Sequence, residues 1–190
     1  MTTNDAAPPR DRILAAAMRL FYADGVRGVG IDRLIRESAV ANATFYRHFP
    51  SKDDVVLAYV REHDRLFREG ASAVSARPAQ EVVEALFAGI ADEFCAPGFR
   101  GCPFINAAAD YPDPGHPVSR AIQEHMDWFR GVLFDLLTAV GHPAPDRAAD
   151  TLLILRHGAM NHSRFTDPEK VREALSAAVA AVLSQASHVS

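Results

Sequence analysis

The sequence has few of the features that mark secreted or membrane proteins. It contains only two cysteines, Cys95 and Cys102, in 190 residues, whereas small secreted domains held by disulfides carry more. No apolar run approaches the roughly 18 residues needed to cross a bilayer. The first nine residues lack the basic and apolar regions of a signal peptide. These absences predict a cytoplasmic protein with no membrane partner.

Signals for strands, catalytic motifs and metal sites are also missing. Alternating β-branched runs bounded by turn residues do not occur, and helical periodicity extends along the whole chain. There is no P-loop, nucleophile elbow, HExxH or dinucleotide glycine motif. His157 and His162 are five residues apart, which places them on different faces of a helix. We therefore expect an all-α protein that is not an enzyme and that binds no cofactor or metal. A hydrolase using Asp110 with His116 or His125 is an alternative that no motif supports.

Charge is distributed unevenly along the chain. The whole sequence has a net charge of −4. Residues 1–52 hold eight Lys/Arg against five Asp/Glu, whereas residues 71–190 hold nine against fourteen. A slightly basic end on an acidic body is compatible with one surface that binds an anion such as DNA.

The apolar pattern and the cap signals predict about nine helices. Gly25 and Gly141 are typical C-terminal stop residues. Ser51 with Asp54 forms a capping-box pattern, and Asp167 before Pro168 forms a helix start. The expected helices cover 10–24, 31–38, 43–49, a segment from 51 to a break at 70–79, 80–94, 103–110, 118–140, 145–164 and 168–186.

Residues 30–52 carry the functional signal. Two short helices joined by residues 39–42 match a helix-turn-helix, in which the second helix enters the major groove. Phe45 and Phe49 lie four residues apart and are expected to pack inward. Lys52, at the start of the next helix, is predicted to contact a phosphate together with backbone N–H groups. The predicted DNA-binding residues are Asn42, Thr44, Tyr46, Arg47, His48 and Lys52.

The segment 10–60 resembles the N-terminal domain of the TetR family of bacterial transcriptional regulators. The similarity is densest over residues 39–53, where Thr44, Tyr46, His48 and Lys52 fit the family pattern. Three positions depart from it: Gly30 replaces a usual Thr, Ala39 a usual Gly and Ala41 a usual Ser. The lost hydroxyl groups remove one helix cap and a possible phosphate contact.

The resemblance implies a DNA-binding domain over residues 1–52 and a helical ligand-binding and dimerisation domain over 53–190. It also implies a repressor that binds a near-palindromic operator as a homodimer, through its last two helices, and leaves it when a small molecule binds. The candidate effector-binding residues are Phe87, Phe94, Phe104, Asn106, His125, Trp128, Phe129 and Arg156. The effector, the operator and the sign of regulation stay open.

Two other functions remain compatible with the sequence. Cys95 and Cys102 would allow a redox-responsive regulator, although their spacing matches neither a metal motif nor a thioredoxin motif. The departures at Gly30 and Ala41 would also suit a helical protein-interaction module that no longer binds DNA.

Overall fold

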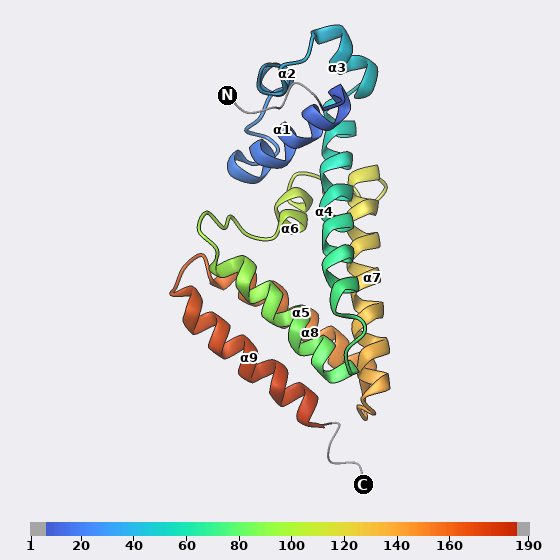
Figure 1. The fold of residues 1–190 in the computed structure, drawn as a ribbon, viewed down its shortest axis with the longest axis vertical. Coiled ribbons are helices and arrows are strands. Elements are labelled where there is room, and N and C mark those ends of the chain that lie inside the picture. Colours follow the sequence, from blue (N-terminus) through green and yellow to red (C-terminus); the bar gives the residue numbers. More distant parts are fainter. Residues whose placement is uncertain (1–6, 186–190) are drawn as a thin grey trace. The chain divides into compact units, whose positions relative to one another are not determined.

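The computed structural model describes residues 7–185, and within them every regular element is a helix (Figure 1). This confirms the predicted all-α class. None of these helices is both long enough and apolar enough to cross a membrane. The helices are α1 (Pro9–Asp24), α2 (Ile31–Ser38), α3 (Asn42–His48), α4 (Lys52–Val74), α5 (Ala79–Cys95), α6 (Pro103–Ala108), α7 (Pro117–Ala139), α8 (Pro145–His162) and α9 (Pro168–Ser184).

The helices form two compact units. The first unit contains the chain up to Arg65 together with Pro103–Gln123, and the second contains Leu66–Cys102 together with the chain from Glu124 onward. Helix α6 and the start of α7 therefore group with the helix-turn-helix. The units do not coincide with the division expected between residues 52 and 53, because packing joins segments that are distant in sequence.

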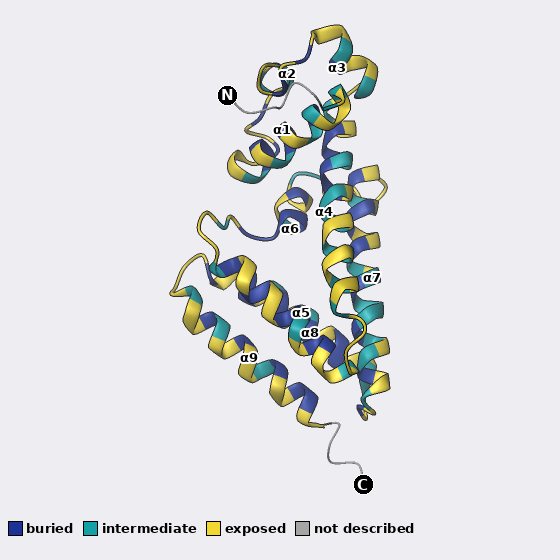
Figure 2. Cartoon of the chain, in the orientation of Figure 1, coloured by how far each residue is buried: buried dark blue, intermediate teal, exposed yellow. Residues whose placement is uncertain are grey.

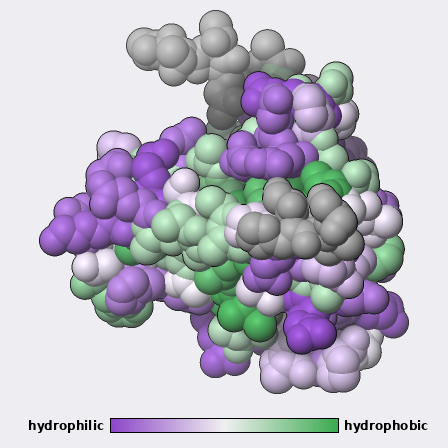
Figure 3. All heavy atoms as spheres, turned by 90° about the horizontal axis from the view of Figure 1, so that it is seen from below, coloured by the Kyte–Doolittle hydropathy of each residue, from purple (hydrophilic) through white to green (hydrophobic). Residues whose placement is uncertain are grey.

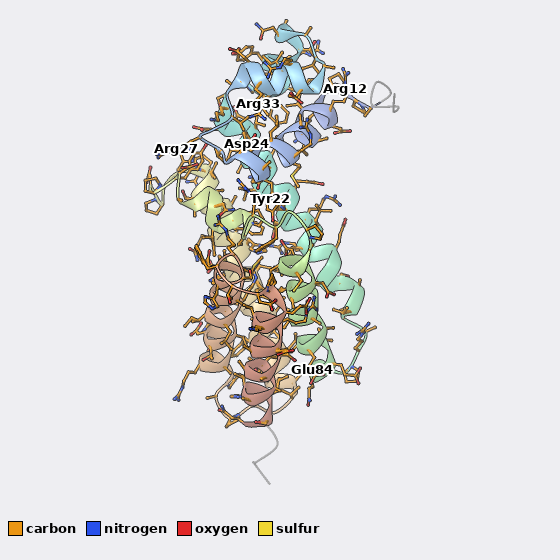
Figure 4. All side chains as sticks on the ribbon, turned by 90° about the vertical axis from the view of Figure 1, so that its left-hand side faces the viewer. Arg12, Tyr22, Asp24, Arg27, Arg33 and Glu84 are labelled. Carbon is orange, nitrogen blue, oxygen red and sulfur yellow. The ribbon has the colours of Figure 1, made fainter. Side chains whose placement is uncertain are left out.

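An aromatic core and a set of surface ion pairs hold the first unit together. Phe21 meets Tyr59 edge to face at 5.5 Å between ring centroids. Arg33 on α2 pairs with Asp24 at the end of α1 at 2.7 Å (Figure 4). Arg19 likewise pairs with Glu37 at 2.9 Å. These contacts fix α1 against α2, which is the platform on which α3 is placed.

In the second unit, α5, α8 and α9 pack against one another. Each presents a buried stripe and an exposed face (Figure 2). The buried residues recur at helical spacing, for example Val83, Phe87 and Ile90 on α5. Hydrophobic and hydrophilic residues are interspersed on the face drawn in Figure 3. The imidazole Nε2 of His142 lies 3.2 Å from the carbonyl oxygen of Val182, which ties the α7–α8 turn to α9.

The cap signals at two helix starts are confirmed. The Ser51 and Asp54 backbone N–H groups donate to each other's side chains, at 2.9 Å and 3.2 Å. The Asp167 carboxylate accepts from the backbone N–H of Glu169 at 3.1 Å, with Pro168 as the first helical residue. Both pairs satisfy N–H groups that a helix start leaves without partners.

Some predicted helix ends were wrong. Helix α4 continues to Val74, so the break expected from residue 70 begins only afterwards, since a run of Ala, Ser and Gly without proline is compatible with a helix. Helix α3 begins at Asn42 rather than at Ala43, with Ala41 as its N-cap and no side-chain cap bond. The predicted end of the last helix at Ala186 lies outside the described residues.

The turn between α2 and α3 contains a strained residue. Ala39 has φ 51° and ψ 40°, the left-handed conformation, and no other described residue except glycine has a positive φ. This conformation costs an L-residue with a Cβ roughly 1–2 kcal/mol. Packing of α2 and α3 around the turn therefore holds Ala39 in a conformation that glycine would adopt more readily.

Replacing Ala39 with Gly should raise the free energy of unfolding by about 1 kcal/mol. The strain is removed, and the extra freedom of glycine in the unfolded chain offsets part of the gain. Chemical denaturation would measure the change. The matched control is Ala43→Gly in α3, which should lower stability by about 1 kcal/mol. A loss of stability in Ala39→Gly would contradict the assignment of strain.

Candidate functional site

The helix-turn-helix is formed by α2, the turn at residues 39–41 and α3. The turn closes with an Ala39 N–H bond to the Arg36 carbonyl oxygen at 3.2 Å, and the Arg12 guanidinium donates to the Ala39 carbonyl oxygen at 3.2 Å (Figure 4). Two short helices joined in this way are the arrangement that inserts the second helix into the major groove.

Burial of two aromatic rings decides which face of α3 is exposed. Phe45 is fully buried and Phe49, at the C-cap, is 3% exposed. With 3.6 residues per turn, Ala43 and Arg47 lie opposite this buried ridge. Both are exposed, as are Asn42 and Tyr46, whereas Thr44 and His48 are half-buried along one flank. The exposed side of α3 is thus centred on Ala43 and Arg47, with Asn42 and Tyr46 toward one flank and Thr44 and His48 toward the other.

Lys52 stands beside this surface as the first residue of α4. The two acids that follow it are engaged within the protein. Asp54 accepts from the Ser51 hydroxyl at 2.6 Å. Asp53 accepts from the Tyr111 hydroxyl at 2.8 Å, and its other oxygen lies 3.3 Å from His116 Nε2. Desolvation, together with the Asp53 carboxylate, raises the pKa of Tyr111.

The basic residues of the first unit fall into two groups. Three arginines form ion pairs: Arg19 with Glu37, Arg27 with Asp110, and Arg33 with Asp24. Within the described part of the chain, Arg47 and Lys52 form none. Arg47 on α3 and Lys52 at the start of α4 are therefore among the cations available to phosphate groups, which are the main source of affinity for DNA.

A second group of predicted residues meets around a buried arginine. Arg156 on α8 is 1% exposed. Its guanidinium carbon lies 5.2 Å from the ring centroid of Phe129 and 5.1 Å from that of Phe67. The Phe67 ring also meets His125 at 5.1 Å and Trp128 at 6.0 Å. Four of the eight candidate effector-binding residues thus cluster, and Phe67 is the member that the sequence analysis missed.

Arg156 is a buried cation without a carboxylate partner. Among the described residues no acid lies within ion-pair distance of it, and its Nε has no hydrogen-bond partner. Its Nη1 lies 3.2 Å from Nε2 of His157, and arginine can only donate, so His157 accepts. Burial, followed by the charge of Arg156, lowers the pKa of His157 to about 4.

The other candidate effector-binding residues lie elsewhere. Phe87 lies in the groove between α5 and α9, beside Leu175 and Val179. The ring of Phe94 meets Phe99 at 6.5 Å. Phe104 and Asn106 are on α6 in the first unit, where Phe104 meets His63 at 6.3 Å. The sequence indicated aromatic residues but not the direction in which each helix presents them.

The cysteines give little support to a redox site. Cys102 is buried, Cys95 is half-buried, and both are free thiols. Desolvation raises the pKa of Cys95 although Arg172 opposes the shift, and a raised pKa reduces the reactive thiolate. No group of three or more His, Cys, Asp or Glu side chains among residues 7–185 is arranged to hold a metal ion.

Comparisons with known proteins place this geometry in a family. The family model described as bacterial regulatory proteins, tetR family, matches residues 13–59. The chain is 30% identical to the transcriptional regulator LmrA of Bacillus subtilis over 63% of this chain and 66% of that relative. A TetR-family regulator from Streptomyces coelicolor matches with a TM-score of 0.90 and 44% identity, over 95% of this chain and 96% of that one. A putative regulator from Streptomyces avermitilis matches with a TM-score of 0.85 and 26% identity, over 95% and 99% of the two chains.

The helical fold and the exposed surface of α3 define a helix-turn-helix transcriptional regulator. The extent of the match to the Streptomyces coelicolor regulator, together with the family model over α1–α4, makes the assignment specific. The chain belongs to the TetR family of bacterial transcriptional regulators, which confirms the resemblance noted in the sequence.

The lowered pKa of His157 predicts a specific acid sensitivity. Unfolded chains take up a proton at this residue below about pH 6.5, whereas the folded chain resists it down to about pH 4. The contribution of His157 to stability is therefore complete above pH 6.5 and is lost as the pH falls toward 4. Between pH 7 and 5 the native protein should lose about 1 kcal/mol more stability than His157→Gln.

Urea denaturation at both pH values would measure this difference. His162→Gln, which alters an exposed histidine near the end of the same helix, is the matched control and should have a smaller effect. An identical pH dependence in the native protein and His157→Gln would show that His157 is not the group that titrates.

Proposed function

We propose that the protein is a repressor that binds a near-palindromic operator as a homodimer and leaves it when a small molecule binds the second unit. Its membership of the TetR family and the uncommitted cations on α3 and α4 support operator binding. The observation that carries this proposal is that Arg47 and Lys52 have no acidic partner among the described residues, whereas Arg19, Arg27 and Arg33 have one.

Roles on the DNA follow from position on α3. Arg47 lies opposite the buried ridge, so it is best placed to reach base edges at the floor of the groove. Ala43, beside it, is small enough to let the helix approach closely. Tyr46, His48 and Thr44 lie toward the flanks, and with Lys52 we assign them to phosphates. Asn42, as the first residue of α3, is assigned to a base edge or a phosphate.

Exposed apolar side chains support a dimer through the last two helices. Ile154 on α8 is 71% exposed, and Phe165, between α8 and α9, is 81% exposed. Large apolar groups in water favour association, because burying them removes apolar surface from solvent. A two-fold symmetric contact through α8 and α9 would present two copies of α3 to two half-sites, about 34–36 Å apart.

Release by an effector requires that ligand binding in the second unit changes the DNA-binding surface. Helix α4 carries both Lys52 and Phe67. These residues are about 22 Å apart along the axis at 1.5 Å per residue. A small molecule that displaces Phe67 would favour conformations in which α4 and α3 are reoriented. Such a ligand shifts the population only by the difference in its affinity for the two states.

Selection from random duplexes should enrich a two-fold symmetric sequence. Affinity for the selected duplex should fall steeply with salt, because each neutralised phosphate contributes about −0.9 to the slope of log K against log [salt]. The double variant Tyr46→Ala/Lys52→Ala should lose most of the affinity and show a shallower slope. Fluorescence anisotropy at several salt concentrations would measure both.

The control for this experiment is Lys170→Ala, which removes an exposed charge on α9 and should leave the affinity and the slope unchanged. Failure of the folded protein to enrich any duplex at low salt would contradict operator binding. Unchanged binding by Tyr46→Ala/Lys52→Ala would show that the DNA surface lies elsewhere.

The dimer interface is tested by placing a charge at its centre. Ile154→Glu should convert a dimer into a monomer at micromolar concentration, because a buried glutamate without a partner is costly. Light scattering coupled to size exclusion would measure the mass. Ala76→Glu, on the exposed turn between α4 and α5, should remain dimeric. A dimer in Ile154→Glu would exclude this face.

A further inference from the structure

Arg156 is unusual because its charge is buried and has no counter-ion. Transfer of an isolated ionised group into a protein interior is strongly unfavourable unless the group is paired and hydrogen-bonded. The aromatic faces of Phe67 and Phe129 recover part of this free energy through cation–π contacts. The Nε–H still has no acceptor. A buried donor of this kind in a native structure calls for an explanation, and a role in binding an anion is one.

A groove in the same unit shares Phe67 with the surroundings of this arginine. It is formed by the second half of α4 and by α5, and its volume is about 320 Å³. Most of its lining is apolar, including Phe67, Val74, Leu86 and Ile90. Phe67 belongs both to the groove and to the surroundings of Arg156. It lines the groove, and the centroid of its ring lies 5.1 Å from the guanidinium carbon of Arg156. Arg156 itself does not line the groove, so a ligand there contacts the arginine only if Phe67 moves aside.

The groove also contains one carboxylate. Glu93 lines it, and although much of this side chain is open to solvent, desolvation of its carboxyl group raises its pKa. The charge of Arg156 acts in the opposite direction. Glu93 is thus within electrostatic range of Arg156 without forming an ion pair with it. It would compete with an incoming acid for the same cation.

We propose that the effector is an anionic amphipathic molecule, a carboxylate with an apolar body, whose acid group pairs with Arg156 while its body occupies the α4–α5 groove. The inference rests on the proposed function, since it assumes that a small molecule regulates the protein. A carboxylate matches the planar fork of the guanidinium and supplies the missing acceptor. The apolar lining of the groove favours a ligand with an apolar body, because burying that body removes apolar surface from water.

Calorimetric titration with matched acids and amides tests the charge preference. The pairs are 4-phenylbutanoate with 4-phenylbutanamide, and octanoate with octanamide. The native protein should bind each acid at least about tenfold more tightly than its amide, because a hydrogen bond to a charged group is stronger than a neutral one. In Arg156→Met this ratio should fall to about one. Glu93→Gln should bind the acids several-fold more tightly and leave the amides unchanged.

Two further variants separate binding from folding. Removal of a buried, unpaired charge should leave the melting temperature of Arg156→Met unchanged or raise it, by about 2–4 °C for each kcal/mol gained. Gly89→Leu places a side chain in the groove, where a Cβ has open space, and should weaken acids and amides equally. A marked fall in the melting temperature of Arg156→Met would mean that Arg156 is structural, and would overturn the proposal.

Other outcomes would also overturn it. These are equal binding of acid and amide by the native protein, an acid preference that survives in Arg156→Met, and no binding of either pair at millimolar concentration. Release of the selected DNA duplex is measured separately. Acids that bind through Arg156 without releasing DNA would support this site and contradict effector release. Release of DNA that does not depend on Arg156 would support effector release and contradict this site.

Discussion

The burial of Phe45 and Phe49 is the constraint on which the DNA-binding surface depends. Helix α3 has only seven residues and no side-chain cap, so it has little stability of its own. Its two rings pack into the first unit and fix its rotation about its axis. Rotation decides which side chains face outward, and it places Arg47 and Ala43 in the middle of the exposed face. The same packing holds Ala39 in its left-handed conformation, since the turn must bring α3 back across α2.

Pairing of charges explains how an acidic protein can present a cationic surface. The net charge of −4 says little about DNA binding, because some of the basic residues, such as Arg19 on α1 and Arg33 on α2, are paired locally with acids and others are not. Asp53 and Asp54 directly follow Lys52, yet both are held by hydrogen bonds within the unit. Their engagement with Tyr111, His116 and Ser51 leaves Lys52 as the uncommitted charge at the start of α4. Local pairing, more than the total charge, therefore determines where phosphate can bind.

Local signals predicted much of this structure, and contacts distant in sequence account for what they missed. The helical period, Gly141 and the Ser51–Asp54 and Asp167–Pro168 pairs indicated most helices and several of their ends. The grouping of residues 103–123 with the first unit had no local signal, because it follows from packing. On α3 the alternation of aromatic and polar residues sufficed to identify the exposed face. In the second unit the predicted aromatic residues were spread over several helices, and only those near Arg156 cluster. Phe67, which lies among them, was not predicted, because its approach to residues 125–129 and 156 depends on contacts distant in sequence.

The cations without acidic partners affect the free energy of folding differently in the two units. On α3 and α4 the unpaired cations are at least partly in contact with water, Arg47 being exposed and Lys52 half-buried, so water screens them and their charge costs little in the absence of DNA. Arg156 is buried, and its cation–π contacts and its contact with His157 offset only part of the cost of an unpaired charge, which a bound anion would reduce further. A ligand that supplies the anion stabilises those conformations in which Arg156 is reached, and reaching it displaces Phe67 on α4. Helix α4 also begins with Lys52. Under the proposal, binding of an anion at Arg156 would therefore move the helix that carries this DNA contact. In the proposed mechanism, coupling between effector and DNA would depend on one unpaired charge and one continuous helix, and it should disappear when Arg156 is replaced by a neutral residue of similar size.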